Sequence, residues 1–237
     1  MRYALLLLLL VIPTSIDAQE STESKYPEAV AIFEEPFHQP VYEQSTFKVL
    51  DVHVPALATT KFHIHAEPIH YVLFQDSYLI EQLAGGEWST PGADELNADL
   101  TQYLGMSSAD IYSAENAKVH RIRNNGQRPF RILGIMNQGA GATHDANILG
   151  QNDWTGEPFE NRWFKSSPIE LMAQSSAEDM HIANDAIIFN PFGDNVQIEI
   201  NGRSARLQDW MAIQRNMNFK LTNKDDEPAR LVLVEIR

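Results

Sequence analysis

The chain has 237 residues, with 32 acidic and 18 basic side chains and a formal net charge of -14. Nucleic-acid affinity is built from clustered Lys and Arg, so this excess of acid argues against a nucleic-acid binder. The same excess disfavours docking on anionic lipid surfaces. There is no Cys, which excludes disulfides, thiolate nucleophiles and thiolate metal sites. Any metal must therefore be held by His, carboxylate or water.

Residues 1–18 have the pattern of a secretory signal peptide. Arg2 precedes an apolar run from Ala4 to Ile12, and Ala18 ends a stretch that fits a cleavage site. The run is shorter than the ~20 residues that a membrane-spanning helix needs, and the alternative is an uncleaved anchor. We therefore expect a secreted or periplasmic protein that does not associate with a membrane once the signal is removed.

The rest of the chain has the pattern of an all-β protein. Short runs of alternating or β-branched residues are separated by turn signals, which favours a closed barrel or a sandwich. We expect a polar N-terminal arm over 19–45 and a first β module over 46–140. A linker with a short helix near Ser167–Ser176 is expected within 141–180, and a second β module over 181–237.

The sequence of one turn and of the strand that follows it occurs twice in the chain. When Asn124 is placed over Asn223, an offset of 99 residues, Pro129 falls on Pro228 and Arg131 on Arg230. The apolar residues that follow also coincide. The repeat predicts two similar β modules in one chain.

Histidines cluster in the first module. His63 and His65 are two residues apart, so on a strand they share one face and lie ~6.6–7 Å apart along the chain. His120 begins a distant strand that leads into an Asn-Gly turn. Three such imidazoles can converge on one ion. The alternative is that they are interior histidines satisfied by hydrogen bonds, and we expect His38, His144 and His181 to be solvated loop residues.

These residues resemble the motifs of the cupin superfamily. Its first motif, a His-x-His pair followed by an apolar strand, is matched by His63-Ile-His65 and by Tyr71-Val72-Leu73, with Pro68 between them. Its second motif, His-x-x-x-Asn, is matched by His120 to Asn124. The resemblance implies a cupin-type double-stranded β-helix, or jelly-roll barrel, in two tandem modules. It further implies a metal-binding N-terminal module and a degenerate C-terminal one.

The resemblance has one gap at the fourth ligand. The glutamate ligand of the superfamily has no clean counterpart, because its place falls near His70 or near Glu67 according to how the loop is counted. The site is then His63, His65 and His120 completed by His70, by Glu67 or by water. Such a shell suits a divalent transition metal: Fe, Zn, Mn, Ni or Cu.

The repeat predicts no metal in the second module. At the offset of 99, His120 maps to Phe219, and the upstream pair maps to Arg162 and Phe164. Phe has no ligand atom, so this module is expected to be structural.

Two functions are open at this point. One is a metalloenzyme, a dioxygenase, isomerase or lyase, with Tyr71 and Glu67 as the nearest candidates for acid–base catalysis. The other is a non-catalytic cupin that binds a metal or a small ligand, or serves a structural role. A small-molecule ligand or substrate is expected in both cases, and a homodimer is the expected assembly.

Overall fold

The computed structural model describes residues 28–90, 103–142 and 158–237. Apart from one short 3-10 helix, η2 (Ile32–Glu34), every regular element in these ranges is a strand, so the all-β prediction is confirmed. In the same ranges no helix is long and apolar enough to cross a membrane. The signal peptide at 1–18 and His144 lie outside the described residues.

The N-terminal module is built from two facing sheets. Its outer sheet has the order β1-β4-β8-β6 and its inner sheet the order β2-β3-β9-β5-β7. These strands are β1 (Val30–Ala31), β2 (His38–Glu43), β3 (Phe47–Val54), β4 (His63–His65), β5 (Ile69–Gln75), β6 (Leu79–Leu83), β7 (Ser107–Asp110), β8 (Lys118–Asn124) and β9 (Phe130–Asn137).

The C-terminal module repeats this plan. Its inner sheet has the order β10-β11-β18-β13-β16 and its outer sheet the order β12-β17-β14-β15. The strands are β10 (Phe159–Glu160), β11 (Phe164–Leu171), β12 (Ser176–His181), β13 (Ala186–Phe189), β14 (Val196–Ile200), β15 (Arg203–Arg206), β16 (Trp210–Ile213), β17 (Asn218–Asn223) and β18 (Ala229–Ile236). The prediction of two tandem jelly-roll modules is confirmed.

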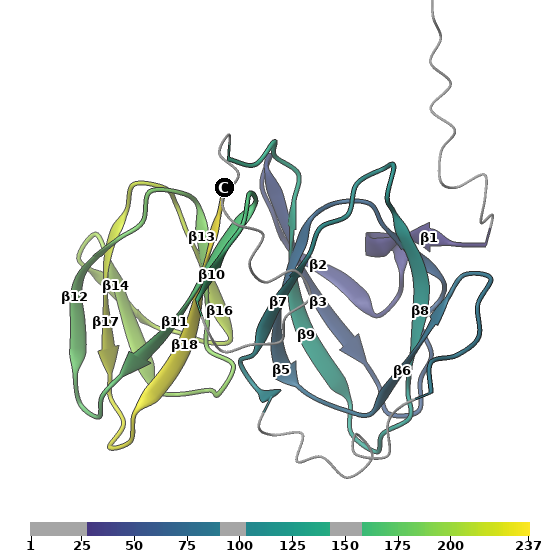
Figure 1. Ribbon diagram of the computed structural model, residues 1–237. Helices are drawn as coiled ribbons and strands as arrows, with labels where there is room; N and C mark the ends of the chain where they lie inside the picture. Colours follow the sequence, from purple (N-terminus) through teal and green to yellow (C-terminus); the bar gives the residue numbers. More distant parts are fainter. Residues whose placement is uncertain (1–27, 91–102, 143–157) are drawn as a thin grey trace, which may run out of the picture.

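The two inner sheets pack against each other, as Figure 1 shows at the centre of the molecule. Each module has its own core between its two sheets, and a third apolar core joins the modules. This shared core contains buried residues from both inner sheets, among them Phe47, Val72, Phe164, Ile187 and Val234. The inner sheet of the N-terminal module is therefore covered by apolar residues on both faces.

Asn124 and Asn223 hold equivalent turns in the two modules, which accounts for the repeat in the sequence. The Asn124 amide nitrogen donates to the carbonyls of Val54, Pro55 and Arg128, and its oxygen accepts from the Gly126 N–H. Asn223 makes the same set of bonds, to Leu171, Met172, Glu227 and Asp225. Both side chains are buried, and each closes one barrel corner with an amide group that donates and accepts at the same time.

Replacing either asparagine with alanine should destabilise the protein. Asn124→Ala and Asn223→Ala each leave several buried backbone groups without a partner, and we expect the free energy of unfolding to fall by ~2–3 kcal/mol. The measurement is urea denaturation followed by tryptophan fluorescence. Asn116→Ala, at an exposed position, is the control, and an equal loss there would contradict this reading.

Two sequence expectations need correction. The polar arm expected over 19–45 is an integral part of the barrel from residue 28 onward, because β1 pairs with β4 and β2 pairs along β3. The linker expected within 141–180 lies outside the described residues over 143–157, and from Phe159 to residue 180 the chain forms β10, β11 and most of β12. Ser167–Ser176 was predicted helical, but residues up to Leu171 belong to β11, which pairs with β18 along its whole length. Pro168 has no N–H to donate, but β10 pairs only with Lys165 and Ser166 of β11. On that edge of β11 Pro168 therefore needs no hydrogen-bond partner.

Candidate metal centre

Three histidines meet inside the N-terminal barrel. His63 and His65 lie on β4, and His63 is directly opposite His120 in the antiparallel pairing of β4 with β8. All three are buried, and one ring nitrogen from each lies within 4.8 Å of the other two. The Nε2 atoms of His65 and His120 are 2.8 Å apart. The prediction that these three residues come together is confirmed.

Each histidine is oriented by a partner at its other ring nitrogen. His63 Nδ1 lies 3.0 Å from the Lys61 carbonyl oxygen, and His65 Nδ1 lies 3.1 Å from the Tyr71 hydroxyl. His120 Nδ1 contacts the carboxylate of Glu81, on β6. With all three Nδ1 atoms engaged, the Nε2 atoms are left to face one another, which is how metal-binding histidines are held.

Burial keeps these rings neutral, as metal ligands must be. Burial and the neighbouring histidines lower the pKa of His63 to about 2 and that of His65 well below its ordinary value. Burial also lowers the pKa of His120, although Glu81 opposes this. Burial disfavours the charged form of Glu81, but its bonds to His120 and Lys118 prevail and lower its pKa to about 2. Glu81 is therefore an anion that accepts from His120.

Further polar side chains lie close to the three histidines. Lys118 forms an ion pair with Glu81, at 2.6 Å, and Tyr112 donates to Asp110 at 3.0 Å. The ring of Tyr112 packs edge-on against His65. Burial and the nearby carboxylates raise the pKa of Tyr71 and of Tyr112, so both phenols stay protonated.

The structure places a fourth histidine beside the site. His38 was expected in solvent, but it is buried and its ring packs edge-on against His63, with centroids 4.5 Å apart. Its Nδ1 lies 3.5 Å from the buried carboxylate of Glu35 without forming a hydrogen bond. That carboxylate accepts from the Phe37 and Lys61 N–H groups. Both residues lie in the N-terminal segment, which pairs with β4 and so forms one wall of the site.

His70 does not join the cluster. It follows Ile69 on β5 and precedes Tyr71, and adjacent strand residues point to opposite faces. Tyr71 contacts His65 inside the barrel, whereas the His70 ring lies in the interface between the modules, 5.2 Å from the Phe159 ring and 5.5 Å from the Phe164 ring. His70 is thus on the wrong side of its sheet to be a fourth ligand.

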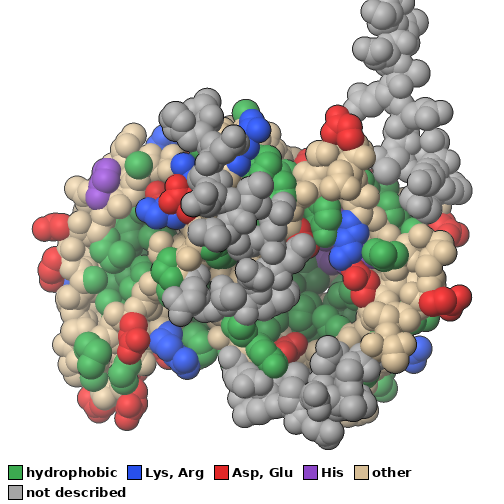
Figure 2. Space-filling model, in the orientation of Figure 1, with side chains coloured by type: hydrophobic (Ala, Val, Ile, Leu, Met, Phe, Trp, Pro, Cys, Tyr) green, Lys and Arg blue, Asp and Glu red, His purple; other side chains and the backbone are tan. Residues whose placement is uncertain are grey.

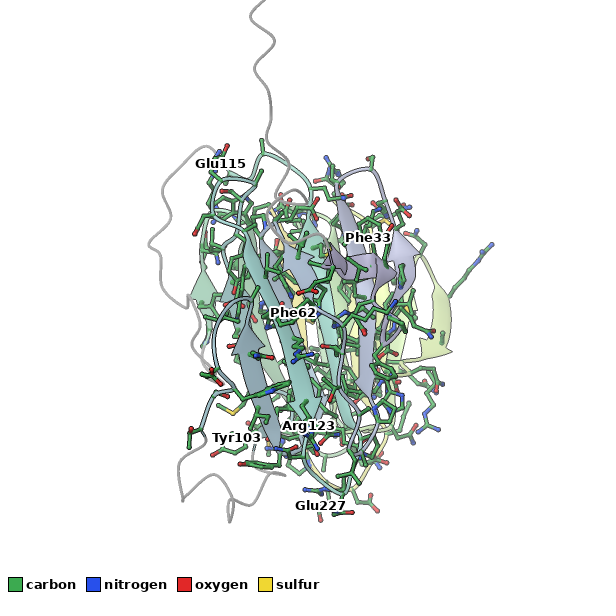
Figure 3. All side chains as sticks on the ribbon, turned by 90° about the vertical axis from the view of Figure 1, so that its right-hand side faces the viewer. Phe33, Phe62, Tyr103, Glu115, Arg123 and Glu227 are labelled. Atoms are coloured by element: carbon green, nitrogen blue, oxygen red, sulfur yellow. The ribbon has the colours of Figure 1, made fainter. Side chains whose placement is uncertain are left out.

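Glu67 does not reach the cluster either. It lies in the loop between β4 and β5, and among the described residues no metal-binding group includes it. The carboxylate that contacts one of the three clustered histidines is Glu81, which was not predicted from the sequence. The alternating pattern of Leu79–Leu83 was the available signal, because it places Glu81 on one face with two leucines. Arg121, next to His120 on β8, lies over the ring of Phe62, which Figure 3 labels on the side facing the viewer.

Glu81 should matter for metal affinity without binding the metal itself. We expect Glu81→Gln to weaken Zn(II) binding about 10–100-fold, because an amide orients the His120 ring less firmly and adds no negative charge. The measurement is competition with a chelator of known affinity. Glu67→Gln makes the same chemical change on the same module and should leave the affinity within a factor of two. Equal losses in both variants would contradict the role of Glu81.

The second module has apolar residues where the first has its histidines. The pair that corresponds to His63 and His120 is Met180 and Phe219, which face each other between β12 and β17. The match of Phe219 to His120 was predicted from the offset of 99. The upstream match to Arg162 and Phe164 was wrong, because the modules differ in loop length and that offset does not hold there.

A two-sheet barrel carrying three histidines, followed by a second barrel without them, defines a tandem cupin fold with one candidate metal centre. The chain has this fold. The sequence itself matches no family model and no curated protein.

Solved structures with the same fold are distant in sequence. AerE from Microcystis aeruginosa is 10% identical with a TM-score of 0.53, over 86% of this chain and 98% of that one. A salicylate 1,2-dioxygenase from Pseudaminobacter salicylatoxidans is 9% identical with a TM-score of 0.56, over 80% and 70%. A cupin 2 conserved barrel domain protein from Leptotrichia buccalis is 8% identical with a TM-score of 0.51, over 84% and 88%.

Proposed function

We propose that this chain binds one divalent transition metal through the Nε2 atoms of His63, His65 and His120. The observation that carries the proposal is the set of three partners at Nδ1, which fixes the rings so that their free nitrogens converge. A donor set of three neutral imidazoles fits Fe, Zn, Mn, Ni or Cu.

We further propose that the site is catalytic and acts on a small organic molecule. When bound, the metal would supply Lewis acidity and, if it is iron, O2 chemistry at its open positions. The chain itself offers Tyr71 and Tyr112 as hydrogen-bond donors and Asp110, whose pKa is raised by burial, as the group able to exchange a proton. In this proposal Asp110 replaces Glu67 as the candidate for acid–base catalysis.

The surroundings of the histidines support a small organic substrate. Apolar side chains, including Ile69, Leu73 and Ile132, form the core of the same barrel. Figure 2 shows a hollow in this face of the N-terminal module, with a histidine and both basic and acidic side chains within it. Among the structures with this fold is a salicylate 1,2-dioxygenase, so iron-dependent dioxygenation is the first reaction to test.

The test begins with metal analysis of protein purified without a His tag. The protein is then reconstituted with Fe(II), Mn(II), Ni(II), Cu(II) or Zn(II) and assayed for O2 uptake and for product with a set of small aromatic and aliphatic substrates. One equivalent of metal with turnover supports the enzyme. One equivalent without turnover favours the non-catalytic binding cupin, and no metal after reconstitution overturns both.

We also propose that the protein acts outside the cytoplasm. The proposal rests on the pattern of residues 1–18 alone. Fractionation of cells that express the full chain, with mass determination of the product, tests both export and cleavage near Ala18. Self-association as a homodimer stays a prediction, which analytical ultracentrifugation would test.

A further inference from the structure

The three groups that contact the Nδ1 atoms differ in whether they can donate a hydrogen bond. The Lys61 carbonyl and the Glu81 carboxylate only accept hydrogen bonds, so His63 and His120 carry their hydrogen on Nδ1. The Nε2 atoms of these two rings then carry a lone pair and no hydrogen, with or without a metal. The partner of His65 is the Tyr71 hydroxyl, which can donate or accept.

The contact between His65 and His120 decides the state of His65 in the metal-free protein. Their Nε2 atoms are 2.8 Å apart, so one of them must carry a hydrogen. His120 already carries its hydrogen on Nδ1, and a second one would make it a buried cation next to Lys118. The hydrogen is therefore on Nε2 of His65, and Tyr71 donates to Nδ1 of His65.

A metal held by the three rings would reverse this arrangement. It would need the Nε2 lone pair of His65, so the hydrogen would have to leave that nitrogen. His65 stays neutral by taking up a proton at Nδ1 while it releases one from Nε2, so the ring has no net gain or loss of protons. Nδ1 is then a donor, and the Tyr71 oxygen must accept from it.

We propose that metal binding switches His65 between tautomers and thereby turns the Tyr71 hydroxyl from a donor to His65 into a free donor toward a ligand in the barrel. This inference rests on the proposed metal site. Its consequence is that a substrate bearing an oxygen acceptor finds the Tyr71 hydrogen available only when the metal is in place. Occupancy of the metal site would thus govern substrate recognition through a hydroxyl that need not touch the metal.

Nitrogen NMR of the histidine side chains tests the switch. Protein with 15N-labelled histidine is compared without metal and with Zn(II), and the His65 signals are assigned from their loss in His65→Gln. We expect the Nε2–H tautomer without metal and the Nδ1–H tautomer with Zn(II), while His63 and His120 carry Nδ1–H in both states. An Nδ1–H tautomer of His65 in the metal-free protein overturns the switch and leaves the metal site intact. Spectra that do not respond to Zn(II) overturn the metal site itself.

A pair of tyrosine variants provides a second readout. Tyr71→Phe removes the acceptor for the Nδ1 hydrogen of metal-bound His65, so Zn(II) affinity should fall about tenfold. Tyr42→Phe makes the same change on β2 of the same module, where the hydroxyl accepts from Gln44, and the affinity should stay within a factor of two. Unchanged affinity in Tyr71→Phe would show that its oxygen does not accept from His65, against the proposal.

Discussion

The double variant His63→Ala/His120→Ala should retain no transition metal under conditions in which the unmodified protein takes up close to one equivalent. These residues supply two of the three converging nitrogens, and the single imidazole of His65 that remains cannot hold an ion against water. Metal analysis after reconstitution and desalting gives the result directly. Circular dichroism of the same samples checks that the variant is folded.

The matched control removes two other histidines. His53 and His181 are both exposed, and the variant His53→Ala/His181→Ala should keep its equivalent of metal. A stoichiometry that falls equally in both double variants would point to adventitious binding by surface histidines. Retention of metal by His63→Ala/His120→Ala would refute the site.

The metal-free protein should lose most of its stability between pH 7 and pH 5. Burial lowers the folded-state pKa of His70 and of His38 to about 3 and that of His63 to about 2, from an ordinary value of 6.5. Below pH 6.5 the unfolded chain therefore binds more protons than the folded one, so stability is intact above that pH and is lost as pH falls toward 3. By pH 5 each group costs about 2 kcal/mol, and three groups together approach the whole stability of a typical domain.

His70→Phe isolates one of these contributions. The ring is fully buried between Phe159 and Phe164, and both of its nitrogens lack a hydrogen-bond partner among the described residues. Phenylalanine should raise the free energy of unfolding at pH 7.5 by about 1 kcal/mol, because it removes unpaired buried polar atoms. At pH 5 the gain should grow to about 3 kcal/mol, because the protonation of His70 in the unfolded chain is also removed.

Urea denaturation of metal-free protein at both pH values measures this difference. His53→Phe makes the same substitution at an exposed position and is the control. A gain for His70→Phe that is the same at pH 7.5 and pH 5 would show that His70 does not contribute to the acid sensitivity.

The three clustered histidines could be predicted because their placement depends on short-range features of the sequence. His63 and His65 share a face because they are two residues apart on one strand, and His120 was placed by its distance from a hairpin turn that the chain repeats. His38 and Glu81 could not be placed in this way. Glu81 comes from β6, which pairs with β8, whereas His38 begins β2 on the inner sheet. Period-2 patterns do not say which strands become neighbours.

The errors have a similar origin. His70 and Tyr71 are adjacent, and only the strand register decides which of them points into the barrel. The sequence of β11 contains two serines and a proline, so it has no clear strand signal, yet pairing with β18 along eight residues overrides local propensity. The fold class was predictable because the many short strand patterns and the repeated turn both indicate two β barrels.

The shared core makes the two modules depend on each other for stability, although the histidine cluster lies in the N-terminal module. The inner sheet of the N-terminal module holds Tyr71 on its barrel face and His70 on the opposite face, against Phe159 and Phe164 of the other module. A chain divided between the modules would expose an apolar sheet on each fragment, and neither fragment would be expected to stay dispersed alone. Among the described residues the C-terminal module has no histidine cluster, yet it covers one face of the sheet that holds Tyr71. Any transfer of the candidate site to another protein must therefore include both modules.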